Sequence, residues 1–131
     1  MKYLPLMALT GALVAPFAFA QTSNVHDGNW EVTISFPSKP IVADLVVSGD
    51  TGMFRSHFGG GKNNACGSKE TPVVVKVATP DELKITIEYS KVLNGCHDLT
   101  LDAKRVDEVT FKGTWPDTRQ GTLETVLVKK K

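Results

Sequence analysis

The sequence predicts a single all-β domain: an antiparallel meander of about eight strands closed into a small β-barrel, with a β-sandwich as the alternative. Three observations predict this class. Apolar and polar residues alternate with a period of two along several segments. The links between these segments are mostly short and rich in Gly, Pro, Asn and Asp, which makes successive strands antiparallel neighbours. After residue 20, no segment shows a helical apolar period with caps.

The first 20 residues are expected to be a signal peptide that is cleaved, which leaves residues 21–131 as one domain. A positively charged start is followed by an apolar run over residues 4–15, and Ala18-Phe19-Ala20 has the small-x-small pattern of signal peptidase sites. Pro5 and Pro16 interrupt the apolar run, whereas a spanning helix needs about 20 apolar residues. We therefore expect a bacterial periplasmic or secreted protein without a membrane anchor in its mature form.

Composition excludes several classes of protein. The chain has 15 Lys and Arg against 14 Asp and Glu, and these numbers become equal when Lys2 leaves with the leader. A nucleic-acid-binding domain usually has a basic excess, so none is expected here. Hydrophobic and charged contents of 41% and 22% are those of a folded chain. The basic tail at residues 129–131 is too short to indicate an anionic partner and is expected to be a solubilising terminus.

The first half of the domain is expected to hold four strands. Residues 30–36 alternate cleanly, and Pro37 and Pro40 then break the chain. The next three segments are less regular but rich in β-branched and aromatic residues, and turn residues 49–52 separate two of them. These segments are residues 43–48, 53–58 and 73–78.

The second half repeats the pattern. Turn residues 79–82 precede the alternating segment 83–89, and alternation resumes over 99–103 and 109–115. Residues 122–129 form the last expected strand. The apolar side chains of the alternating faces are expected to point inward: Trp30, Val32, Ile34, Phe36, Val73, Val75, Ile85, Ile87, Leu99, Leu101, Phe111 and Trp115.

Asn94-Gly95 predicts a two-residue hairpin between the fifth and sixth strands. Both residues tolerate the positive φ of a type I′ turn, so Leu93 would pair with Cys96 and fix the strand register.

The two cysteines, Cys66 and Cys96, are expected to form a disulfide. An even number of cysteines in an exported chain favours a bridge, and their 30-residue separation matches no zinc-ligand spacing. Two free thiols or half of a metal site are the alternatives.

Residues 59–70 form a long polar link with three consecutive glycines, and a loop of this length in a compact domain is often functional. Its candidate binding residues offer hydrogen-bond donors and acceptors: Lys62, Asn63, Asn64, Ser68 and Lys69. Gly59–Lys62 is not a phosphate-binding loop, because Ser56 and Asn63 occupy positions that the motif requires to be Gly and Ser or Thr.

No catalytic residue, metal site or cofactor is predicted. His26, His57 and His97 lack ligand spacing and are interpreted as solvent-exposed or turn residues. There is no Gly-x-Ser-x-Gly elbow, and the sequence does not place any two carboxylates opposite each other.

Gly28-Asn29-Trp30 opens the first expected strand, and Gly113-Thr114-Trp115 closes the seventh. With an eight-strand meander, the first tripeptide resembles the calycin group of lipocalins and avidins. That resemblance implies an up-and-down barrel with ligand access at one end; the alternative is that both tryptophans plug a core. We expect a non-enzymatic exported binding module for an unidentified small molecule or protein. The alternative is a protein-interaction or inhibitor domain that acts through residues 59–70.

Overall fold

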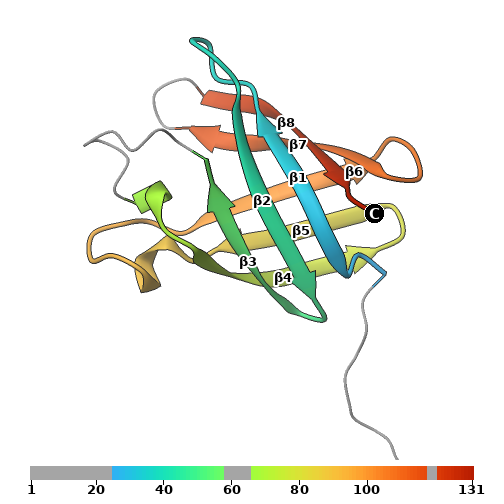
Figure 1. Cartoon of the computed structure of the whole chain (residues 1–131), viewed down its shortest axis with the longest axis horizontal. Helices are drawn as coiled ribbons and strands as arrows, with labels where there is room; N and C mark the ends of the chain where they lie inside the picture. Colours follow the sequence, from blue (N-terminus) through green and yellow to red (C-terminus); the bar gives the residue numbers. More distant parts are fainter. Residues whose placement is uncertain (1–24, 58–65, 118–120) are drawn as a thin grey trace, which may run out of the picture.

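The computed structural model describes residues 25–57, 66–117 and 121–131. They form a closed antiparallel barrel in which the strands follow sequence order and β1 pairs with β8 (Figure 1). The strands are β1 (Gly28–Ile34), β2 (Ile41–Ser48), β3 (Thr51–Ser56), β4 (Thr71–Thr79), β5 (Glu82–Ile87), β6 (Leu99–Arg105), β7 (Thr110–Asp117) and β8 (Gly121–Lys129). The predicted eight-strand barrel is confirmed, and the pairing of β1 with β8 excludes the sandwich.

The strand ends differ from the predicted ones where the chain leaves the barrel wall. Phe36 follows the end of β1, and Val109 is exposed in the turn before β7. Tyr89 does not continue β5 but begins the short 3-10 helix η3 (Tyr89–Lys91). Its ring is nevertheless buried, so the alternation of buried and exposed side chains continues beyond the end of β5, although the backbone there is no longer a strand.

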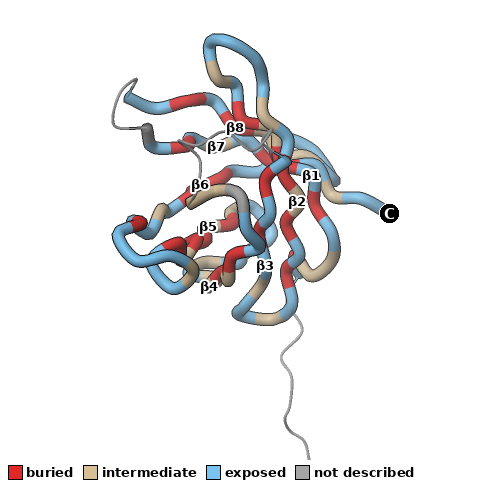
Figure 2. The backbone as a smooth tube through the Cα atoms, turned by 60° about the vertical axis from the view of Figure 1, so that its left-hand side comes forward, coloured by how far each residue is buried: buried red, intermediate tan, exposed pale blue. Residues whose placement is uncertain are grey.

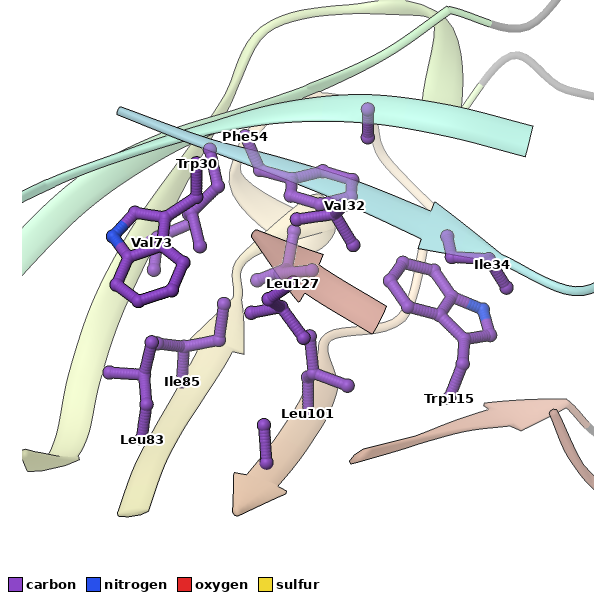
Figure 3. Packing of buried hydrophobic residues seen from close by; sticks show 14 of the residues in the cluster. Trp30, Val32, Ile34, Phe54, Val73, Leu83, Ile85, Leu101, Trp115 and Leu127 are labelled. Atoms are coloured by element: carbon purple, nitrogen blue, oxygen red, sulfur yellow. The ribbon is translucent and has the colours of Figure 1, made fainter. Parts of the chain in front are cut away.

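The barrel interior is filled with side chains. Buried and exposed residues alternate along the strands (Figure 2), and side chains from opposite walls meet in the middle (Figure 3). The predicted inward residues are confirmed: nine are buried, and Phe36, Val75 and Leu99 are partly buried against the core. Further core side chains come from strands for which the sequence did not indicate which residues point inward: Ala43, Leu45, Val47, Phe54, Leu123 and Leu127.

The two ends of the barrel are built differently, because successive links alternate between them. One end carries the turns at 49–50, 80–81 and 106–109 together with Val25–Asp27 and Lys130–Lys131; we call it the sealed end. The links that follow β1, β3, β5 and β7 leave from the other end, where residues 35–40, 57, 66–70 and 88–98 are described; we call it the loop end. In Figure 1 the loop end is at the upper left and the sealed end at the lower right.

The predicted hairpin at Asn94-Gly95 is wrong. A turn does form there, since Gly95 has φ 91° and the Cys96 N–H donates to the Leu93 carbonyl at 3.2 Å. However, the strands pair beyond it, with Ile87 opposite Leu99. Residues 88–98 are therefore a second long link, because buried Tyr89 and Cys96 hold the chain against the core on either side of the turn.

Candidate functional site

At the sealed end, an aromatic cluster closes the barrel. The Trp30 Nε1–H donates to the His26 carbonyl at 2.9 Å, and the His26 Nε2–H donates to the Thr79 carbonyl at 2.6 Å. The His26 ring lies edge-on to Phe111 at 5.0 Å between centroids and to Trp30 at 5.9 Å. His26 lies in a turn, as one expectation allowed, but its side chain is buried rather than solvent-exposed. The chain before β1 thus forms a plug that the sequence did not reveal.

The two Gly-x-Trp tripeptides serve the two ends. Gly28 has φ 133° and lies against the Lys129 side chain, whose Nζ is 5.8 Å from the centroid of the Trp30 ring. Gly113 lies where β7 approaches β6 so closely that a Cβ would be 2.2 Å from the Asp102 carbonyl oxygen. Trp115 stacks on Phe54 at 5.7 Å near the loop end. Figure 3 shows Trp30 and Trp115 at opposite sides of the packed cluster, so each fills one end of the core.

Between the two tryptophans, the core side chains are fully buried. The innermost residues have no exposed surface: Val32, Ala43, Leu45, Ile85, Ile87, Leu101, Ala103 and Leu127. The middle of the barrel is therefore packed with side chains.

At the loop end, a disulfide between Cys66 and Cys96 joins the two long links, with 5.8 Å between their Cα atoms, so the predicted bridge is confirmed. Cys66 begins the 3-10 helix η2 (Cys66–Ser68) and packs partly against the core, where Cys96 is buried. The Ser56 hydroxyl donates to the Gly67 carbonyl, and the Thr71 hydroxyl donates to the Lys69 carbonyl at 2.9 Å. The chain just after Cys66 is thereby fixed to the barrel.

The 88–98 link has its own polar anchor. The Asp98 carboxylate accepts hydrogen bonds from the Ser90 N–H at 3.0 Å and the Ser90 hydroxyl at 2.7 Å. These two donors hold the pKa of Asp98 below its ordinary value, because they favour the charged carboxylate. Leu93 lies exposed between this anchor and the disulfide.

Of the candidate binding residues, Lys62, Asn63 and Asn64 lie outside the described residues, as does the rejected phosphate-loop segment 59–62. Ser68 ends η2, and Lys69 is exposed beside it. Their role in binding stays a prediction.

A polar cluster on the outer wall went unpredicted. The Asp44 carboxylate on β2 contacts His57 Nε2 at 2.7 Å and Lys130 Nζ at 3.0 Å. Hydrogen bonds from Lys130 and then His57 lower the pKa of Asp44. The three residues are far apart in sequence and meet only through strand pairing. Within the described ranges, no group of three or more His, Cys, Asp or Glu residues could hold a metal ion.

Comparisons with known proteins support the fold alone. No protein-family model matches the sequence, and no curated protein matches it. A solved structure of a redesigned β-barrel is similar, with a TM-score of 0.53 and 16% sequence identity over 80% of this chain and 91% of the other. This likeness supports a small β-barrel and shows no relationship to calycins. No helix in the described parts of the chain is both long and apolar enough to cross a membrane.

Proposed function

We propose that the protein is an exported, non-enzymatic binding module that recognises another protein through its loop end. The observation that carries this proposal is the contrast between a filled interior and two long links joined by a disulfide. The innermost side chains have no exposed surface, which favours binding on the outside of the barrel over the internal small ligand that the calycin resemblance implied. Binding is then expected at the outer surface, where loops on a rigid scaffold commonly hold the binding residues.

The construction of the loop end supports this function. The disulfide, the Ser56–Gly67 hydrogen bond and the Ser90–Asp98 pair restrict the links before any partner arrives. Such preorganisation lowers the entropy cost of association. Exposed Leu93 and Lys69 offer an apolar and a charged contact on the two bridged links.

Export is part of the same proposal. A disulfide persists in oxidising compartments and is rare in the cytosol, so the Cys66–Cys96 bridge supports a periplasmic or secreted location. The predicted leader lies outside the described residues.

Site-specific photocrosslinking tests the binding face. Leu93 at the loop end and Val109 at the sealed end are a matched pair, because 37% of the first and 45% of the second are exposed. A photoreactive phenylalanine analogue replaces each residue in turn, and the protein is irradiated in periplasmic extract. We expect discrete adducts from position 93 and none from position 109. Equal adducts from both positions, or adducts from position 109 alone, would overturn the assignment of the loop end.

Shortening the link between β3 and β4 gives a second test. Replacing residues 60–64 with a two-residue linker keeps Cys66 and both strands, so we expect a thermal melt close to wild type and loss of the position-93 adducts. A variant that melts normally and retains every adduct would show that residues 60–64 take no part in binding.

A further inference from the structure

The outer wall of β1, β2 and β3, which faces the viewer in Figure 1, carries a groove of about 340 Å³. Its apolar floor is Val46 on β2 and Met53 on β3, which are direct neighbours across the strands. They are 42% and 37% exposed, which is high for large apolar side chains that stand side by side. The groove lies on the outside of the barrel, and of its lining residues only Glu70 belongs to a loop-end link.

Polar groups border this floor. Asn29 is opposite Val46 on β1, and Arg55 follows Met53 by two residues, so both face outward beside the floor. Glu70, just before β4, also lines the groove. The lining also includes Asp44 and Lys130, which form an ion pair with each other at 3.0 Å.

The strand register explains why Arg55 is available. Asp44 is its direct cross-strand partner, but the Asp44 carboxylate is held by Lys130 at 3.0 Å and by His57 at 2.7 Å. Among the described residues, no carboxylate lies within ion-pair distance of Arg55 or cation within that distance of Glu70. The Arg55 guanidinium therefore presents its planar donors to solvent at the end of the apolar strip.

We propose that this groove binds the C-terminal end of an extended peptide whose last side chain is apolar. The terminal carboxylate would accept two parallel hydrogen bonds from Arg55, while the last side chain would lie on Val46 and Met53. Asn29 can both donate to and accept from a peptide group, and Glu70 can accept from a peptide N–H. This proposal does not depend on the function assigned to the loop end.

A peptide fits the groove better than a fatty acid, which shares the carboxylate and the apolar chain. A hydrocarbon tail has no donor for Glu70 and no partner for the Asn29 amide, and polar groups covered without partners cost free energy. A peptide main chain supplies both.

NMR titration of the whole folded protein tests the proposal. The probe is acetyl-Ala-Ala-Leu with a free carboxylate, and the matched probe is the same tripeptide with a C-terminal amide. We expect the free acid to shift the backbone amides of Val46, Met53 and Arg55, and the amide probe to bind at least tenfold more weakly. No shifts at these residues, or equal affinity for both probes, would overturn the proposal.

Matched arginine variants sharpen the test. Arg55→Gln is expected to weaken binding of the free acid at least tenfold, while Arg105→Gln, at an exposed arginine on β6, leaves it unchanged. Equal effects of the two variants would refute a specific role for Arg55. Decanoate serves as the lipid probe, and tighter binding of decanoate than of the peptide would assign the groove to fatty acids instead. Because the loop-end adducts are measured separately, either proposal can fail while the other stands.

Discussion

The sealed end and the loop end close the same barrel by different means. At the sealed end, tight turns bring the strands together, and side-chain packing and hydrogen bonds among His26, Trp30, Phe111 and Thr79 complete the closure. At the loop end, two of the links are much longer, and a disulfide with local hydrogen bonds holds these two to the wall. Closure of the sealed end buries its side chains, whereas the disulfide at the loop end leaves much of the link surface exposed.

This difference shows how stability and recognition can be separated in a small domain. Side chains that fill the sealed end cannot also contact a partner, because they are buried. A disulfide stabilises its end without burying much surface, mainly by restricting the unfolded chain in the loop-entropy account. The free energy of unfolding should therefore depend on core packing at both ends and, at the loop end, also on the bridge.

Among the substitutions considered, Trp30→Ala should lower the free energy of unfolding the most. We expect it to lower the free energy of unfolding by about 3–5 kcal/mol, the range for large buried aromatics, since Trp30 is 1% exposed and its indole is hydrogen-bonded. Trp115→Ala, with 8% of that residue exposed, should fall in the lower part of this range. Urea unfolding measures both. Glu31→Ala, on the outer face of the same strand as Trp30, is the control, and a cost equal to that of Trp30→Ala would contradict the sealed-end account.

Removing the bridge with Cys66→Ala and Cys96→Ala together should lower the free energy of unfolding by about 2–4 kcal/mol. The barrel should still fold, because the bridge joins links rather than strands. Two-dimensional NMR of the variant should show shifts over residues 66–70 and 88–98 and an unchanged His26–Trp30 region. Loss of the sealed-end structure in this variant would mean that the ends are not independent.

His26→Ala isolates the plug before β1. It removes an aromatic ring beside Phe111 and a hydrogen bond to the Thr79 carbonyl, so we expect a loss of about 2 kcal/mol in the free energy of unfolding. His97→Ala is the matched control, because His97 is exposed at the loop end. Equal stability of the two variants in urea would show that the plug contributes nothing.

Asp44→Asn should have the smallest effect, at most about 1 kcal/mol at pH 6, because an exposed ion pair stabilises weakly. The pKa of Asp44 is lowered from 3.8 in the folded protein, so its contribution is present above that value and is lost as the pH falls through the lowered pKa. Urea unfolding should therefore separate wild type from variant at pH 6, and the difference should shrink as the pH falls below 3.8. A difference that grows on acidification would have the wrong sign for this ion pair, and Asp50→Asn in an exposed turn serves as control.

The sequence predicted the parts of the fold that depend on one strand at a time. Trp30, Val32 and Ile34 point inward because alternation places them on one face, whichever strands lie beside them. The Asn94-Gly95 prediction failed because it considered only the local turn preference. The burial of Tyr89 and Cys96, which that preference does not reveal, makes the link longer than a two-residue hairpin.

Contacts between strands were beyond the sequence. Asp44, His57 and Lys130 meet because β2 pairs with β3 on one side and β1 on the other, while the Lys130 N–H donates to the Asn29 carbonyl at 2.8 Å. Arg55 faces an apolar floor for the same reason. Neither arrangement can be recognised from a pattern in the amino-acid sequence, because the strand register depends on pairing across the whole sheet.

The positions of Val25 and Lys129 at the sealed end have a practical consequence for engineering. The Lys129 Nζ donates to the Val25 carbonyl at 3.5 Å, so the first described residues lie beside the last strand. A short linker from Lys131 to Val25 would allow circular permutation, with new termini opened at exposed Ser38 in the link between β1 and β2. A fusion tag attached after Lys131 would begin at the sealed end, so immobilisation through it on a sensor surface would leave the loop end accessible.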